Sequence, residues 1–239
     1  MSRKPFRKLR VTFIVGLFAL FAVLLYQFGL FVMVVWLNFS NPSSSAFMDA
    51  TRGRLHASNE QARISYEWVP YDQISDHLKQ AVVASEDANF MAHGGVEWEA
   101  IRQAWEYNRR QASEGKAKRR GGSTITQQLA KNLFLSQSRS YTRKAQELVL
   151  AYMLELVMPK KRILELYLNI AQWGRHVFGA QAAANLYYQT GAGQLGPAQA
   201  ARLATMLPNP VFYEANRNTP YLQSRTATIQ QRMRLVTIP

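Results

Sequence analysis

An uncharged run from Val11 to Leu37 constrains this chain more than any other feature of its sequence. The run has 27 residues. At about 1.5 Å per residue, a helix of that length spans roughly 40 Å and crosses the hydrocarbon core of a bilayer with some tilt. The apolar part of a cleaved signal peptide is shorter, at about 7–15 residues. The sequence therefore predicts a retained transmembrane helix at residues 11–37.

The charges on the two sides of this run predict its orientation. The first acidic residue after the run is Asp49, whereas the residues before it are strongly basic. Because positive charge beside a membrane span stays on the cytoplasmic side, we expect residues 1–10 to form a cytoplasmic basic tail and the rest of the chain to lie outside the cytoplasm. The basic residues of the tail are Arg3, Lys4, Arg7, Lys8 and Arg10.

The net charge of +14 favours anionic partners, which include nucleic acid, anionic lipid headgroups and phosphorylated substrates. The predicted orientation argues against nucleic acid, because the basic domain faces away from the cytoplasm. It favours anionic lipid or a lipid-linked phosphate instead. The chain has no cysteine, which excludes disulfides and thiolate metal sites, and its histidines show no metal-binding spacing.

The remaining sequence predicts one mainly α-helical domain. Residues 38–62 are polar and favour a linker, which leaves residues 63–239 for the domain. Alternating side chains at residues 63–69 favour one short strand, and the apolar spacing beyond them is helical. Thr124 and Gln127 predict a capping box, and Thr142 predicts another helix N-cap. We expect helices at residues 74–86, 98–107, 125–134, 143–158, 160–169, 179–188, 197–207 and 220–236.

The first candidate site is the segment at residues 86–95, where two adjacent carboxylates end an apolar helix face. Apolar surroundings desolvate a carboxylate and raise its pKa, which suits Glu86 to act as a general base or acid. Asp87, Phe90 and His93 follow in the same segment. The alternative is a solvated helix end with a surface acid pair, since charged helix ends are common.

The second candidate site is the segment at residues 121–132. Its two glycines would allow the backbone to approach a ligand closely, and the helix that follows points its free N–H groups back at that loop. The pair Gln127–Gln128 and the cation of Lys131 belong to this segment. The loop before it adds Lys116, Lys118, Arg119 and Arg120, so the segment predicts a phosphate site. The alternative is a flexible basic loop before an ordinary N-cap.

A third group contains Arg139, Arg143, Lys144 and Glu147. Arg143 and Glu147 share a helix face, which fits either a surface ion pair worth a few tenths of a kcal/mol or a carboxylate held among cations near a pyrophosphate. A fourth block, residues 163–169, favours scaffold, because its apolar residues and Tyr167 have the spacing of a buried helix face.

Together these blocks resemble the peptidoglycan glycosyltransferases, lysozyme-like enzymes that polymerise lipid II, and above all the monofunctional biosynthetic type. The family pattern E-D-x-x-F-x-x-H-x-G is matched from Glu86, G-G-S-T-I-x-Q-Q-x-x-K-N from Gly121, R-K-x-x-E from Arg143 and I-L-x-x-Y-L-N from Ile163. A fifth block at residues 182–188 is also similar. The resemblance covers roughly residues 68–210 in the family's order.

The chain departs from the family pattern at three places. Glu97 stands where an Asp is usual, Tyr188 where a Phe is usual, and Gln189–Thr190 where Gly-Lys is usual. The last departure removes a cation, so no binding role is assigned there.

The resemblance implies a mainly α, lysozyme-like, bilobal domain preceded by one transmembrane helix. It also implies the inner (cytoplasmic) membrane of a bacterium, with the catalytic domain in the periplasm. The implied reaction polymerises lipid II into β-1,4 glycan strands with inversion and releases polyprenyl pyrophosphate. Glu86 would be the general base and Glu147 a second catalytic carboxylate that orients cations. Substrate binding is implied for Asp87, Phe90, His93, Ser123, Thr124, Gln127, Gln128, Lys131, Asn132, Arg139, Arg143 and Lys144.

The implied partners are lipid II, the polyprenyl-pyrophosphate-linked glycan, membrane lipids and other cell-wall synthases, with no nucleic acid. The scheme requires no cofactor and assigns no metal site, although Glu147 could hold Mg²⁺ or Mn²⁺ against the pyrophosphate. Two other functions stay open: a lysozyme-like hydrolase or lytic transglycosylase, and a non-catalytic envelope binding protein. The helix at residues 98–107, with Trp98 and Trp105, either enters the bilayer interface or packs in the core.

Overall fold

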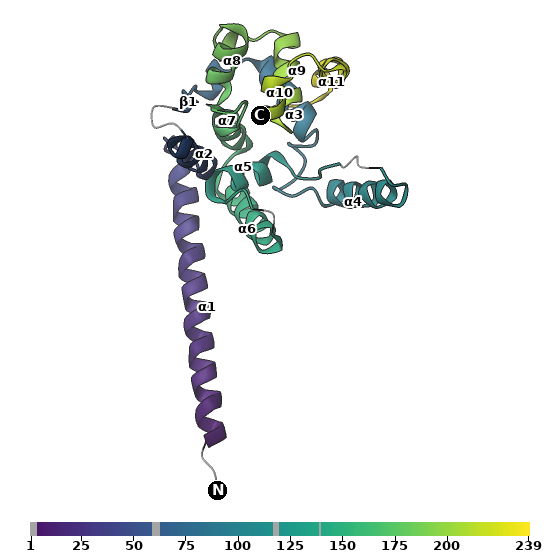
Figure 1. The fold of residues 1–239 in the computed structure, drawn as a ribbon. Helices are drawn as coiled ribbons and strands as arrows, with labels where there is room; N and C mark the ends of the chain where they lie inside the picture. The colour runs from purple at the N-terminus through teal and green to yellow at the C-terminus, as the bar shows by residue number, and fades with distance from the viewer. Residues whose placement is uncertain (1–3, 59–62, 117–119, 139) are drawn as a thin grey trace. The chain divides into compact units, whose positions relative to one another are not determined.

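The computed structural model describes residues 4–58, 63–116, 120–138 and 140–239 (Figure 1). The chain divides into two units, residues 1–40 and residues 41–239. The first unit contains the long helix α1, and the second is a helical domain.

Helix α1 (Lys4–Leu37) contains the predicted membrane span. Its segment Arg10–Leu37 has a mean hydropathy of 2.4, and within the described residues it is the one helix long and apolar enough to cross a membrane. Most of its large apolar side chains are exposed, including Phe18 and Phe21. The helix predicted at residues 11–37 is confirmed. It starts earlier, at Lys4, because Lys and Arg are good helix formers and extend it without a break.

The prediction of a linker at residues 38–62 is wrong for Ala46–Ser58, which form helix α2. This helix belongs to the domain, because Met48 is fully buried, Leu55 is nearly so, and α2 packs against the later helix α5. The start of the domain therefore moves from residue 63 to residue 41. Residues 59–62 of the predicted linker lie outside the described residues.

The rest of the domain is mainly α-helical, as predicted. Strand β1 (Ser65–Tyr66) pairs in parallel with β2 (Val177–Phe178), so the strand predicted at residues 63–69 is confirmed over two residues. The α-helices are α3 (Asp76–Glu86), α4 (Trp98–Ser113), α5 (Ile125–Phe134), α6 (Tyr141–Val157), α7 (Lys160–Ile170), α8 (Ala180–Tyr188), α9 (Pro197–Met206), α10 (Pro210–Ala215) and α11 (Pro220–Arg232). Short 3-10 helices are η1 (Tyr71–Gln73), η2 (Ala192–Gln194) and η3 (Met233–Leu235).

Two groups of packed helices form the core, in keeping with the predicted two-lobed domain. In one group α3 packs against α9 and α11, with Leu78 and Leu203 fully buried. In the other, α5 packs against α6 and α7, with Leu129 and Leu150 fully buried. The two groups meet at the end of α3, since Glu86, its last residue, is hydrogen-bonded to a side chain of α5.

Helix α4 differs from the core helices because little of it is buried. Ala104 is its one buried residue, whereas Trp98 is 60% exposed and Trp105 is 62% exposed. In Figure 1 the helix extends away from both packed groups. Its start lies against α6, where the indole Nε1 of Trp98 donates a hydrogen bond to the Tyr152 hydroxyl at 3.2 Å. Of the two alternatives for this helix, packing in the core is therefore excluded.

Candidate active site

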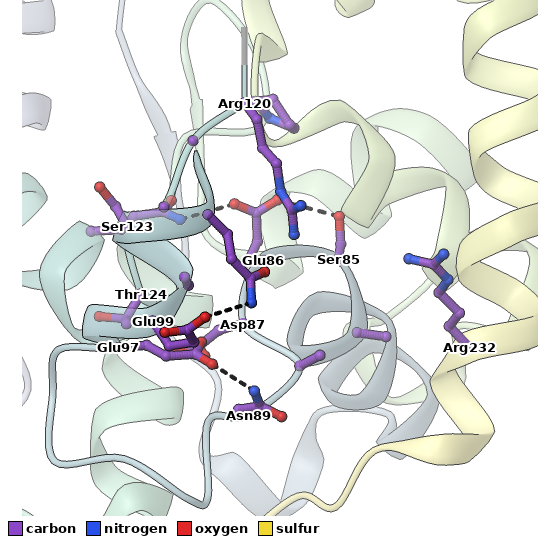
Figure 2. Close-up of a pocket in the computed structure, with 18 of the residues that line it drawn as sticks. Ser85, Glu86, Asp87, Asn89, Glu97, Glu99, Arg120, Ser123, Thr124 and Arg232 are labelled. Carbon is purple, nitrogen blue, oxygen red and sulfur yellow. Dashed lines mark hydrogen bonds between the residues drawn. The ribbon is translucent and has the colours of Figure 1, made fainter. Parts of the chain in front are cut away.

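Glu86 lies partly exposed on the wall of a cavity of about 600 Å³ (Figure 2). The amide Nε2 of Gln128 donates to its Oε2 at 2.9 Å, and the hydroxyl of Ser85 donates to its Oε1 at 3.3 Å. The cavity is lined by the end of α3, the start of α4, the loop before α5 and residues of α11. It is large enough for a sugar ring and is lined by polar groups that could orient one.

Burial raises the pKa of the Glu86 carboxyl above its ordinary value. The hydrogen bonds from Gln128 and Ser85 act in the opposite direction, followed by the positive charges of Arg225 and Lys131. The prediction that an apolar helix end desolvates this carboxylate is thus confirmed. A carboxylate with a raised pKa and one face open to a cavity is suited to accept a proton.

Asp87 is buried and holds the neighbouring loops together. Its carboxylate accepts hydrogen bonds from His93 Nε2 at 2.9 and 3.0 Å and from the backbone N–H of Ile125, the first residue of α5, at 2.9 Å. The His93 Nδ1 accepts the N–H of Gly95, so the ring proton lies on Nε2 and points at Asp87. Both side chains therefore hold the loops of the site together, and Asp87 also lines the cavity, so their contact with substrate stays a prediction.

The predicted capping box at the start of α5 is confirmed. The Thr124 hydroxyl accepts the N–H of Gln127, and Gln127 Oε1 accepts the N–H of Thr124. Thr124 also donates to the carbonyl of Gly95 at 2.5 Å, which ties α5 to the loop that carries His93. Because Gln127 is fully buried, it fixes the helix start and does not face substrate.

Both glycines line the cavity, but only Gly122 also packs against a helix. A Cβ on Gly122 would lie 3.0 Å from the carbonyl oxygen of Ala100 and 3.0 Å from the Cα of Ile101, both in α4. A Cβ on Gly121 would meet nothing within 4 Å. Gly122 is therefore needed where the loop crosses the backbone of α4, and close approach of a ligand stays a prediction for Gly121.

Glu147 is buried and lies among cations, as the second of its two interpretations predicts. Arg143 donates to its Oε2 at 2.7 Å, and Lys144 forms an ion pair with its Oε1. Lys144 also donates to the Ser123 hydroxyl at 3.0 Å, which links this cluster to the cavity wall. Both oxygens of Glu147 thus hold cations in place, so we assign it a positioning role and not direct contact with reacting atoms.

Lys131 is a third cation near this cluster. Burial lowers its pKa, whereas the nearby charge of Glu147 raises it. Among the described residues it has no ion pair, and its Nζ lies 5.4 Å from the centre of the Phe47 ring in α2. The helix that replaces the predicted linker therefore contacts a predicted binding residue.

Of the remaining predicted residues, Phe90 is fully buried and Asn132 is largely buried, so neither is placed to meet a substrate. Phe90 packs instead beneath Lys160, whose Nζ lies 4.4 Å from the ring centre. Ser123 and Gln128 line the cavity together with Glu86. The predicted residues Lys118, Arg119 and Arg139 lie outside the described residues.

Among the cavity residues that were not predicted are two cations, Arg225 and Arg232 of α11. Figure 2 shows Arg232 extending toward the cavity from that helix. The two arginines are seven residues apart and so share one helix face. This spacing is the one signal in the sequence that points to them. They add positive charge to the cavity, and the charge of Arg225 acts on Glu86.

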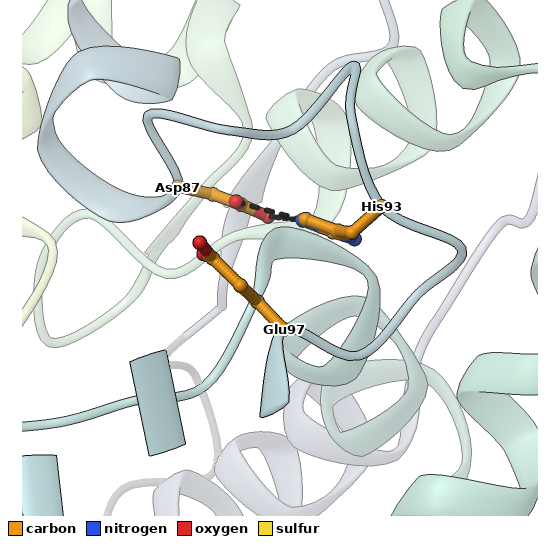
Figure 3. Close-up of side chains that lie close together, drawn as sticks. All are labelled: Asp87, His93 and Glu97. Atoms are coloured by element: carbon orange, nitrogen blue, oxygen red, sulfur yellow. Dashed lines mark hydrogen bonds and ion pairs between the residues drawn. The ribbon is translucent and has the colours of Figure 1, made fainter. Parts of the chain in front are cut away.

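Asp87, His93 and Glu97 are the group of described residues whose donor atoms could converge on a metal ion, since these atoms lie within 4.8 Å of one another (Figure 3). They fit an ion poorly, because His93 already donates to Asp87 and Glu97 accepts from Asn89 at 2.6 Å. Glu147 fits no better, because both of its oxygens are bonded to cations.

Comparison with known proteins agrees with this geometry. A model of the family described as transglycosylase matches residues 53–234. The chain is 66% identical over 216 residues to the biosynthetic peptidoglycan transglycosylase of Bordetella pertussis, covering 90% of this chain and 89% of that protein. It is 52% identical over 217 residues to the protein of the same name from Herminiimonas arsenicoxydans, covering 91% and 92%. For that of Laribacter hongkongensis the identity is 49% over 226 residues, covering 95% and 96%.

The helical fold and the carboxylate cavity, set beside these similarities, define an enzyme of the glycosyltransferase class. More particularly, the chain belongs to the transglycosylase family, and the resemblance found in its motifs is confirmed.

Proposed function

We propose that this enzyme polymerises lipid II, the lipid-linked disaccharide of peptidoglycan, outside the cytoplasmic membrane. The observation that carries the proposal is Glu86, a carboxylate of raised pKa held by Gln128 at a sugar-sized cavity. Lys131 interacts electrostatically with Glu86 and also with Glu147, Arg143 and Lys144. A base and a group of cations therefore lie near one another. Attack by a sugar hydroxyl on a pyrophosphate-linked sugar needs both.

In the proposed reaction, ionised Glu86 takes the proton of the acceptor sugar's 4-hydroxyl while that oxygen attacks the donor's anomeric carbon. The bond to the pyrophosphate oxygen breaks, and the pyrophosphate leaves with the electron pair. An α-linked donor then gives a β-1,4 product, and the hydroxyl takes the place that water has in an inverting glycosidase. Arg143, Lys144 and Lys131 offset the charge that grows on the leaving group, and Glu147 keeps the first two in position.

We propose that this stabilisation comes from side chains and requires no cofactor. The support is that Arg143 and Lys144 are already held by Glu147, whereas neither Glu147 nor the group Asp87, His93 and Glu97 is free to take an ion. Enzyme treated with a chelator should still polymerise lipid II. Complete loss of product that Mg²⁺ or Mn²⁺ restores would show that an ion is required.

We also propose a single-pass protein of the inner membrane, with residues 1–10 in the cytoplasm and the domain in the periplasm. The apolar helix and the basic residues before it support this orientation. The exposed indoles of α4 support a contact between the domain and membrane lipid.

Incubating the full-length protein with purified lipid II tests the proposed reaction. We expect a ladder of longer glycans, and we expect Glu86→Gln to abolish it without loss of folding. Glu114→Gln is the matched control, because Glu114 is exposed and pairs with Lys116. Fragments released from isolated sacculi without any ladder would show a lysozyme-like hydrolase. A Glu86→Gln variant as active as the control would remove Glu86 as the base.

A further inference from the structure

Tyr167 connects a block that looks like scaffold to the proposed base. It lies on α7, is 1% exposed, and belongs to the motif at residues 163–169. Its hydroxyl donates to Oε1 of Gln128 at 3.0 Å, and Nε2 of the same amide donates to Oε2 of Glu86 at 2.9 Å. A row of two hydrogen bonds therefore runs from the core, through the cavity wall, to the carboxylate.

The direction of these bonds follows from the groups involved. An ionised carboxylate only accepts hydrogen bonds, so the NH₂ of Gln128 must face Glu86 and its oxygen must face Tyr167. A phenol can donate to that oxygen, and it stays protonated because burial, together with the nearby charges of Glu86 and Asp87, raises the pKa of Tyr167 well above 10. With no donor at residue 167, Glu86 alone would hold the amide in that orientation.

We propose that Tyr167 is a positioning residue for the reaction assigned above, because its hydroxyl locks the Gln128 amide with its N–H directed at Glu86. The bond from Gln128 then keeps Glu86 ionised and aimed at the cavity. The inference rests on the proposed function, since it concerns the base of that reaction.

Other groups face Glu86 from the elements packed around it, and they stay unchanged when the Tyr167 hydroxyl is removed. They are Ser85 on α3, Lys131 on α5 and Arg225 on α11. The hydrogen bond from Gln128 lowers the pKa of Glu86 more than any of the other groups that oppose burial. Loss of its alignment should therefore let the pKa of Glu86 rise.

The test compares full-length wild type, Tyr167→Phe and Tyr187→Phe in lipid II polymerisation over a range of pH. Tyr187 is the matched control, because its hydroxyl donates to the backbone carbonyl of Trp173 and not to a cavity residue. For Tyr167→Phe we expect kcat to fall about tenfold, as for loss of one orienting contact, while KM stays within about twofold. The acidic limb of its kcat profile should move to higher pH, and that of Tyr187→Phe should not.

A second variant separates this effect from a general loss of packing. Gln128→Met removes the middle of the row at a partly exposed position and leaves every core side chain in place, so it should shift the acidic limb in the same direction. In the Gln128→Met background, Tyr167→Phe should add no further change in kcat or in the limb. If Tyr167→Phe does not fold, Gln128→Met is compared with wild type alone. A shift of the acidic limb of its kcat profile then shows whether the Gln128 amide sets the pKa of Glu86.

Two outcomes would overturn the inference. One is an acidic limb in Tyr167→Phe or Gln128→Met that coincides with wild type. The other is an equal drop in kcat from Tyr167→Phe with and without Gln128→Met, which would mean that the tyrosine acts only through packing. A wild-type protein that makes no glycan ladder would instead refute the proposed function itself, so the two failures are distinguishable.

Discussion

Among single residues, Glu86 is placed where its charge opposes folding. Its pKa is raised in the folded protein, whereas in the unfolded chain it returns to an ordinary value near 4.5. Between those two pKa values the folded protein binds the proton more tightly than the unfolded chain does, so stability falls as pH rises through that window. The ionised base that catalysis needs is therefore a local source of instability at neutral pH.

We accordingly expect Glu86→Gln to be more stable than wild type at neutral pH. A neutral amide of similar size removes the poorly solvated charge and can still pair with Gln128. The free energy of unfolding, measured in urea across a pH series, should differ most at neutral pH and converge as the pH falls below 4.5, where Glu86 becomes protonated in both states. An inactive variant that is no more stable than wild type at neutral pH would contradict this.

Lys131 is the second residue with a specific expectation. Because Lys131 forms no ion pair among the described residues, a substrate phosphate would be its first directly paired anion. Replacing it by Ala should raise KM for the pyrophosphate-linked donor by about tenfold or more, as for a lost charge-assisted contact. Lys161→Ala is the control, since Lys161 pairs with Asp72 at the surface. Donor curves that coincide for both variants would exclude this role.

At the scale of elements, the start of α5 supports the site. Thr124 caps the helix and also binds the loop carbonyl of Gly95, and Asp87 accepts the first N–H of the same helix. Three bonds from two preceding segments thus fix the direction of α5, which carries Gln128 and Lys131. A negative carboxylate at a helix N-terminus also interacts favourably with the helix dipole.

Removing this cap should destabilise the domain more than an ordinary cap does. Thr124→Ala loses about 1 kcal/mol of capping and leaves a buried carbonyl unpaired, for a total of about 2–3 kcal/mol. Ser140→Ala is the control, because Ser140 caps α6 with one exposed bond to the Arg143 N–H, worth about 0.5–1 kcal/mol. Chemical denaturation of both variants measures the difference, and equal losses would show that the bond to Gly95 adds nothing.

Elements whose signals are local could be predicted from the sequence. The capping box at Thr124 and the end of its helix at Phe134 depend on adjacent residues, and both are confirmed. The cap of α6 is Ser140 and not the predicted Thr142. The two residues are two positions apart in the sequence, and their hydroxyls are hydrogen-bonded to each other. Helix α2 was missed because it has no strong apolar periodicity of its own and depends on burying Met48 against the domain.

The chemistry of the site was predictable, but which side chains face the cavity was not. The motifs contain the base and the cations, yet Phe90 and Gln127 of the same motifs turn into the core. Burial is decided by how distant helices pack, which no single motif specifies. Arg225 shows the converse, since it belongs to no motif and the packing of α11 against α3 brings it to Glu86.

At the scale of the whole molecule, two features point to a membrane. One is the apolar helix α1, which is long enough to cross a bilayer, and the other is a set of exposed aromatic side chains on the domain. Besides Trp98 and Trp105 on α4, the linked helix α6 exposes Tyr152 and Leu156. Exposed indole rings beside basic residues, such as Arg109 stacked on Trp105, are typical of helices that lie at a membrane interface. A polymerase of lipid-linked sugars would gain from such a contact, because its substrate's reactive end lies at that interface.

The absence of cysteine from the chain allows this contact to be measured directly. A nitroxide attached at Trp105→Cys, in full-length protein reconstituted into lipid nanodiscs, should be relaxed more by oxygen, which concentrates in lipid, than by a water-soluble nickel complex. The control is Leu186→Cys on α8, a site that is also exposed but has no indole neighbours on its helix, and it should show the reverse order. Because the interface is shallow, the Trp105 label should report a depth near the headgroups, within about 5–10 Å of the acyl boundary. If both labels favour the nickel complex, α4 stays in water, and α1 alone brings the enzyme to its substrate.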